Sequence, residues 1–179
     1  MTRSGPLPGA VASAAVLLGG CATGDRSADV TELDNTWRAN LVPKSSPALM
    51  VGTFERFCVE TSGLAARETA LRRAGYVPLA DRGTPGTRAF VVDDTRPAVA
   101  VSENMCLVQA RARTGQTERF ERYVTVRFPD AVETDPAPLG RSISQAWSVP
   151  GPAIIATERV QDVDWNNFAL IYYRPEGAS

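Results

Sequence analysis

The 179-residue sequence contains no histidine. Histidine is the usual general base near neutral pH and the commonest protein ligand of zinc and copper. Its absence excludes catalysis by Ser-His-Asp or Cys-His groups, and it excludes metal sites built on histidine. An enzyme mechanism in this chain would have to use carboxylates, serine or tyrosine.

Lysine is also scarce, and the chain has no net positive charge. Lys44 is the only lysine, and the formal net charge of the chain is -1. Nucleic acids and anionic membrane surfaces attract clustered Lys and Arg, so we expect no nucleic-acid partner. The apolar content of 44% and the charged content of 22% are typical of a globular protein, and the length predicts one domain.

The uncharged run at residues 9–20 is too short to cross a membrane as a helix, which needs about 20 apolar residues. Its length suits the core of a signal peptide, which has about 7 to 15 apolar residues after a positively charged start. Arg3 supplies that charge. The run ends in the tetrapeptide Leu18-Gly19-Gly20-Cys21.

This tetrapeptide resembles the lipobox of type II signal peptides, which bacterial lipoproteins carry. The resemblance implies cleavage before Cys21, a diacylglyceryl group on its thiol and acylation of the new amino terminus. Residues 1–20 would then be the signal peptide, and lipid on Cys21 would hold the protein to a membrane. In that family Asp after the cysteine favours the inner membrane, so Ala22 implies the outer membrane, facing the periplasm, in a Gram-negative host. An ordinary cleaved signal peptide and a cytosolic N-terminal helix are the alternatives.

Residues 21–46 are mostly polar and predict a lipid-attached tether. The spacing of Leu33, Trp37 and Leu41 by four also allows a short amphipathic helix there. The globular domain is predicted to span residues 47–179.

Within this domain, an apolar face, a capping serine and a final glycine predict a helix at residues 62–75. Apolar clusters and alternation predict strands at 89–92, 99–101, 105–113, 154–160 and 168–174.

Two segments are ambiguous, and 129–141 is predicted to be a loop. Residues 48–59 fit a strand or a short buried helix, and 116–128 fit a helix better than a strand. The fold class is therefore α+β, a small single domain with an antiparallel sheet and two or so helices packed on one face. No internal repeat is apparent from the sequence.

Cys58 and Cys106 remain once Cys21 is lipidated. Cys106 falls on the apolar face of the alternating segment 105–113, which places it inside. An exported protein meets an oxidising compartment, so we expect these two cysteines to form a disulfide. Two free buried thiols are the alternative.

Two groups of carboxylates that are close in sequence could form a site: Asp93 with Asp94, and Asp130 with Glu133 and Asp135. Either group could supply paired carboxylates or oxygen ligands for Ca²⁺. Neither has the spacing of a calcium loop, and both lie beside prolines or turn residues. We interpret them as solvated loop charge and expect no metal and no cofactor.

Four aromatic residues of the C-terminal part could form a binding surface: Trp147, Trp165, Tyr172 and Tyr173. Packing in the core and sheet is the favoured interpretation. The adjacent tyrosines must point to opposite sides of a strand.

Together these patterns predict a membrane-anchored envelope lipoprotein with a small, non-enzymatic binding or structural domain. Its partner would be a protein or a glycan of the envelope, besides the membrane reached through lipid on Cys21. One alternative is a histidine-free envelope enzyme that uses paired carboxylates, for instance on glycan. The other is an inhibitor of an extracellular hydrolase that inserts the loop at 136–140.

Overall fold

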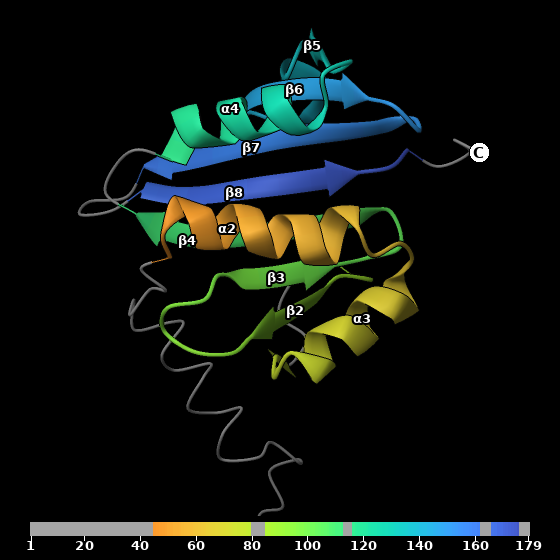
Figure 1. The fold of residues 1–179 in the computed structure, drawn as a ribbon, viewed down its shortest axis with the longest axis vertical. Coiled ribbons are helices and arrows are strands. Elements are labelled where there is room, and N and C mark those ends of the chain that lie inside the picture. The colour runs from red at the N-terminus through yellow and green to blue at the C-terminus, as the bar shows by residue number, and fades with distance from the viewer. Residues whose placement is uncertain (1–44, 80–84, 113–115, 162–165, 176–179) are drawn as a thin grey trace, which may run out of the picture.

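The structure, a computed structural model, describes residues 45–79, 85–112, 116–161 and 166–175 (Figure 1). These residues form one small domain with three α-helices and a single eight-stranded antiparallel sheet. The predictions about the leader, about Cys21, about the tether and about Trp165 lie outside the described residues.

The α-helices are α2 (Pro47–Phe54), α3 (Leu64–Arg73) and α4 (Gln116–Arg127), and a π-helical turn, η1 (Glu55–Val59), continues α2. The strands are β1 (Val77–Pro78), β2 (Arg88–Val91), β3 (Ala98–Val101), β4 (Met105–Ala112), β5 (Val132–Thr134), β6 (Ile143–Val149), β7 (Ala153–Gln161) and β8 (Asn166–Tyr173).

The ambiguous segment at 48–59 is helical throughout. The Ser46 side chain caps α2 by accepting a hydrogen bond from the Leu49 N–H at 3.2 Å, and Pro47 occupies the first turn. The predicted helix at 62–75 is confirmed as α3, and the helical interpretation of 116–128 is confirmed as α4. Gly75 ends the α3 region with φ of 86°, a conformation that glycine adopts without strain.

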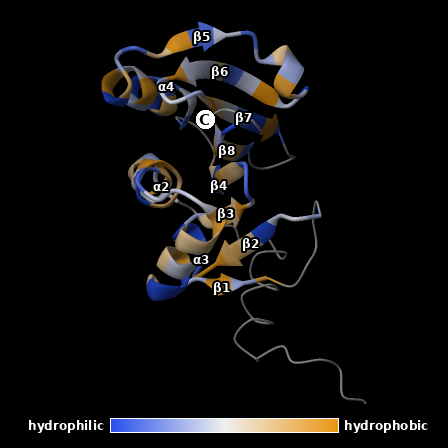
Figure 2. Ribbon diagram, turned by 90° about the vertical axis from the view of Figure 1, so that its right-hand side faces the viewer, coloured by the Kyte–Doolittle hydropathy of each residue, from blue (hydrophilic) through white to orange (hydrophobic). Residues whose placement is uncertain are grey.

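The sheet consists of two four-stranded meanders joined in the middle. Its strand order is β1-β2-β3-β4-β8-β7-β6-β5, so β4 and β8 are the two central strands (Figure 2). They pair over eight positions, from Met105 opposite Tyr173 to Ala112 opposite Asn166. All five predicted strands are present. Strands β1, β5 and β6 were not predicted, and β5 lies within the predicted loop at 129–141.

The two halves of the chain repeat one plan, and this corrects the expectation that there is no internal repeat. A helix precedes each meander, with α3 added in the first half. The pattern Phe-Glu-Arg-aromatic occurs in both helices, at residues 54–57 and again at 120–123. Phe54 and Phe120, the first residues of the two copies, are both completely buried.

One core cluster joins the helices to the sheet. Alternate residues of β4, Cys106, Val108 and Ala110, are completely buried, as the alternation of this segment predicts. They belong to the same cluster as buried side chains from all three α-helices, which are Met50, Phe54, Leu71, Phe120 and Val124. α2 contacts β4 and β8, α4 contacts β7 and β8, and α2 and α4 contact each other.

The structure joins Cys58 and Cys106 in a disulfide, as the sequence predicts, with their Cα atoms 5.3 Å apart. Cys58 lies in η1 and Cys106 in the central strand β4. The bond therefore fixes the end of the segment formed by α2 and η1 directly to the middle of the sheet. Both cysteines are almost completely buried.

A buried arginine holds the same corner of the fold. Arg67 of α3 donates hydrogen bonds to the carbonyl oxygens of Cys58, at 3.1 Å, and Thr61, at 3.0 Å. Burial lowers the pKa of its guanidinium group from the ordinary value. These hydrogen bonds tie α3 to Cys58 of η1 and to Thr61, which follows the turn.

Candidate functional site

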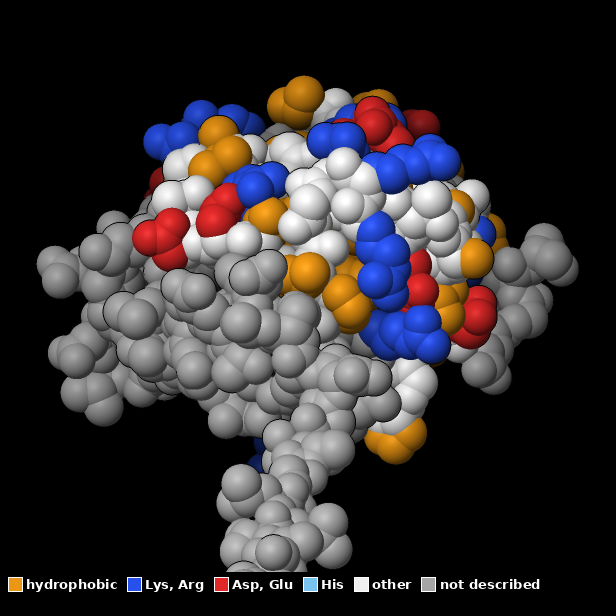
Figure 3. Space-filling view, turned by 90° about the horizontal axis from the view of Figure 1, so that it is seen from below, with side chains coloured by type: hydrophobic (Ala, Val, Ile, Leu, Met, Phe, Trp, Pro, Cys, Tyr) orange, Lys and Arg blue, Asp and Glu red, His pale blue; other side chains and the backbone are white. Residues whose placement is uncertain are grey.

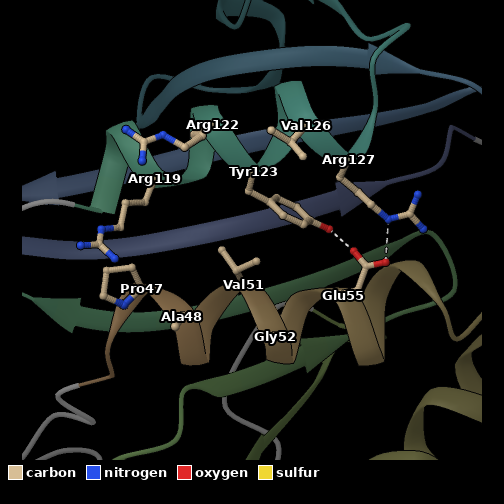
Figure 4. Close-up of a pocket in the computed structure, with 10 residues that line it drawn as sticks. All are labelled: Pro47, Ala48, Val51, Gly52, Glu55, Arg119, Arg122, Tyr123, Val126 and Arg127. Carbon is tan, nitrogen blue, oxygen red and sulfur yellow. Dashed lines mark hydrogen bonds and ion pairs between the residues drawn. The ribbon is translucent and has the colours of Figure 1, made fainter.

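A groove of about 840 Å³ runs between α2 and α4 on the surface of the domain (Figure 4). Ligand sites in proteins are typically concave and largely apolar, with a few polar groups that orient the ligand. The groove fits this description. It is lined by Pro47, Ala48, Val51, Gly52, Glu55, Arg119, Arg122, Tyr123, Val126 and Arg127.

The middle of the groove is apolar and open to solvent. Val51 comes from α2, and Val126 projects from α4 with 76% of its surface exposed. Gly52 adds further space, because a Cβ atom placed there would meet no atom within 4 Å. A valine so exposed beside other apolar groups is typical of a binding surface.

One end of the groove is closed by a polar network centred on Glu55. The Tyr123 hydroxyl donates a hydrogen bond to one carboxylate oxygen of Glu55. The Arg127 Nε donates to the other oxygen at 2.8 Å and forms an ion pair with it. Burial, followed by the hydrogen bond and the negative charge of Glu55, raises the pKa of Tyr123 well above its ordinary value. Tyr123 therefore stays protonated, and both oxygens of Glu55, the only carboxylate among the described residues that line the groove, are engaged.

The other end carries two arginines without a counter-charge. Arg119 and Arg122 are exposed residues of α4, and their side chains extend toward the Pro47 end of the groove, away from Glu55 (Figure 4). Among the described residues, neither forms an ion pair or a hydrogen bond with another side chain. The groove thus has a positive end, an apolar middle and a neutral end.

Charged side chains of both signs also lie on another face of the domain. Seen from the end of the molecule where β1 and α3 lie, the described surface places arginine and carboxylate side chains next to one another (Figure 3). One such pair joins Arg88 and Glu68 at 2.8 Å.

The carboxylates singled out from the sequence lie outside the groove. Asp93 accepts hydrogen bonds from Thr95 and from Arg96 and so shapes the turn between β2 and β3. Asp135 accepts a hydrogen bond from the Ala137 N–H at 3.0 Å, at the start of a 3₁₀ turn, η2 (Ala137–Leu139). Glu133 lies on the edge strand β5. The structure does not bring the two groups together into one site.

The pKa of Asp93 leads to a test of the turn. Burial raises this pKa, but the hydrogen bonds from Arg96 and Thr95 lower it by a larger amount. The pKa of Asp93 therefore falls to about 2. A carboxyl group with a lowered pKa stabilises the fold above the unfolded-state value of about 3.9, and that contribution is lost as the pH falls toward 2. Because 37% of the side chain is exposed, we expect Asp93→Asn to cost at most about 1 kcal/mol at pH 7. Denaturant unfolding at pH 7 and at pH 2 checks this, since the difference between variant and wild type should nearly vanish at pH 2. A difference that stays constant over this range would contradict the assignment.

Of the four aromatic residues, Trp147 is buried in the core, as the favoured interpretation predicted. Tyr172 packs against the same core cluster. Tyr173 lies opposite Met105 and Ile154, and its side chain leaves the strand on the other side from that of Tyr172. Trp147 and Tyr172 thus pack in or against the core, and Trp165 lies outside the described residues.

The groove was not found from the sequence. Its residues come from two helical segments that lie 64 or more positions apart in the chain, so no local motif contains them. The repeated pattern Phe-Glu-Arg-aromatic was the available signal, because it marks the two helices that line the groove and contains both Glu55 and Tyr123.

The described residues contain neither a membrane-spanning helix nor a cluster of metal-binding side chains. No helix among them is both long and apolar enough to span a membrane. In the same ranges, no three side chains of the metal-binding types gather where they could hold an ion. No protein-family model, curated protein or solved structure matches this chain.

Proposed function

We propose that this chain is a lipid-anchored protein of the bacterial cell envelope whose small domain binds a ligand in the groove between α2 and α4. Lipid on Cys21 would hold it to the membrane, the outer one facing the periplasm in a Gram-negative host. The lipobox-like tetrapeptide at 18–21 supports the anchor. The observation that carries the binding role is the groove itself, with exposed Val126 in its apolar middle and two unpaired arginines at one end.

The arrangement of the helices supports a role for their outer surface. We infer that α2, α3 and α4 cover one face of the sheet, because side chains from all three join one core cluster with the buried face of β4. The groove would then open on the outer side of this helical layer, away from the sheet. Pro47, at the arginine end of the groove, is the groove residue nearest to Cys21 along the chain.

The chemistry of the groove favours binding over catalysis. The chain has no histidine, and the carboxylate of Glu55 is held by Tyr123 and Arg127. Both oxygens of this carboxylate already have a partner within the domain, so neither is free for a ligand. The surrounding residues position a ligand without offering it a reactive group.

Native mass spectrometry of the protein purified from its own membranes in mild detergent tests this proposal. We expect the wild-type protein to carry an additional, non-covalently bound mass. Gly52→Phe should lose that mass, because the open space at Gly52 lets the ring occupy the groove without disturbing the backbone.

Ala65→Phe is the matched control, since Ala65 is an exposed residue of α3 outside the groove. It should retain the bound mass. A wild-type protein without added mass, or the same added mass on Gly52→Phe, would refute the groove as the binding site.

A further inference from the structure

We propose that the groove between α2 and α4 binds a single-chain amphiphile with one acidic head group, such as a fatty acid. Its acid group would contact Arg119 and Arg122, and its acyl chain would lie along the apolar middle of the groove. This inference rests on the proposed function, because it names the ligand of the same site.

The two unpaired arginines argue for an anionic head group. Arg119 and Arg122 are three positions apart on α4, which places their side chains on the same face of the helix. Like charges this close repel each other slightly, and an anion bound between them would remove that repulsion. Glu118 lies one turn before Arg122 on α4, and Glu121 precedes Arg122 directly, but in the described structure neither carboxylate forms an ion pair with these arginines. An arginine pair can hold a carboxylate or a phosphate through several charge-assisted hydrogen bonds.

The opposite end of the groove argues against a second charged group on the ligand. Arg127 is already neutralised by Glu55 at 2.8 Å, and the remaining oxygen of Glu55 accepts the Tyr123 hydroxyl. A ligand with charges at both ends would meet a site with no free counter-charge there. A ligand with one negatively charged end and an apolar body matches the groove, which has a positive end, an apolar middle and a neutral end.

The groove as a whole has about the length of a short acyl chain. The positive end begins at Arg119 and the neutral end lies at Arg127, eight positions along α4, which corresponds to about 12 Å of helix. Between them the lining consists of Val51, Gly52, the Tyr123 ring and Val126. These residues offer no free hydrogen-bonding group to the backbone of a peptide, so an acyl chain suits the groove better than an acidic protein segment.

Calorimetric titration with dodecanoate tests the inference. The protein is the chain from residue 22 onward, which lacks the acylated cysteine but contains the whole described core. We expect saturable binding, weaker by about tenfold for decanoate, because two fewer CH₂ groups are buried. Dodecanol has the same chain without the acid and should bind at least about tenfold more weakly than dodecanoate.

Variants of single arginines locate the head group. Arg119→Gln and Arg122→Gln should each weaken dodecanoate binding by about threefold to tenfold and leave dodecanol binding unchanged. Arg73→Gln removes an exposed arginine of α3 outside the groove and should change neither affinity. Circular dichroism and thermal unfolding of each variant show that the fold is retained.

Two results would overturn the inference. Equal affinity for dodecanol and dodecanoate, or unchanged binding in both groove variants, would exclude the arginines as the head-group site. Absence of dodecanoate binding, together with a native ligand mass that Gly52→Phe removes, would show that the groove binds a different class of ligand, such as an acidic protein segment. In that case the proposed function would stand and the amphiphile would be wrong.

Discussion

Replacing both Cys58 and Cys106 with alanine should lower the free energy of unfolding by about 4 kcal/mol. The disulfide closes a loop between residues 48 positions apart, and the chain-entropy model assigns about this value to a loop of that size. For a domain of this length, each kcal/mol corresponds to about 3 °C, so the melting temperature should fall by about 12 °C. Denaturant and thermal unfolding of the oxidised wild type and the double variant measure the difference.

Reduction of the wild-type protein removes the same bond without changing the sequence, so the reduced protein can be compared with the double variant. Wild-type protein that has been unfolded, reduced and refolded should have the stability of the double variant. Both cysteines are almost completely buried, so the folded protein should resist a reductant that the unfolded protein does not. Equal denaturation midpoints for oxidised wild type and double variant would show that the bond does not stabilise the fold.

This disulfide was predictable from two features of the sequence, the apolar alternation around Cys106 and the number of cysteines. The alternation of β4 places Cys106 on the buried face, and the structure confirms that it is completely buried. Setting Cys21 aside leaves two cysteines, which can pair in one way only. The place of Cys58 in the fold could not be predicted, because residues 48–59 fit both a strand and a helix.

The missed strands have particular causes. β6 contains a register shift between Ile143 and Gln145, which breaks the alternation by which a strand is recognised. β5 is a three-residue edge strand, exposed at every position, within a segment rich in proline and aspartate. It has no buried face, so its sequence carries no apolar pattern.

The groove could not be predicted for a different reason, because it depends on contacts between segments far apart in the chain. Glu55 and Tyr123 meet because β4 and β8 lie side by side and carry α2 and α4 into contact. Single-sequence patterns report which residues share one helix face but not which helices are neighbours. The repeated Phe-Glu-Arg-aromatic pattern indicates two similar helices, and the strand order shows that they belong to two halves with the same plan. Phe57 and Tyr123 occupy the same position of the pattern, and the hydroxyl group that distinguishes them is the one that binds Glu55.

Replacing Cys21 with serine should abolish lipid attachment completely. Only the cysteine thiol can receive the diacylglyceryl group that the lipobox resemblance implies. Each buried CH₂ of an acyl chain contributes about 0.8 kcal/mol to membrane binding, so two or three chains hold a protein durably. In the host, the wild-type protein should incorporate labelled palmitate and should have a mass that corresponds to a chain beginning at residue 21 with lipid attached. Cys21→Ser should incorporate no label and should retain residues 1–20.

Cys58→Ser is the control that separates lipid attachment from a general effect of losing a thiol. It should still be labelled, because Cys58 lies in the domain and pairs with Cys106. An unlabelled wild-type protein that still begins at Met1 would contradict the anchor. It would also remove the argument from export for the disulfide, because a chain that stays in the cytosol meets a reducing environment. The anchor and the Cys58–Cys106 bond are therefore linked predictions, and the same labelled sample can test both if its free thiols are counted before and after reduction.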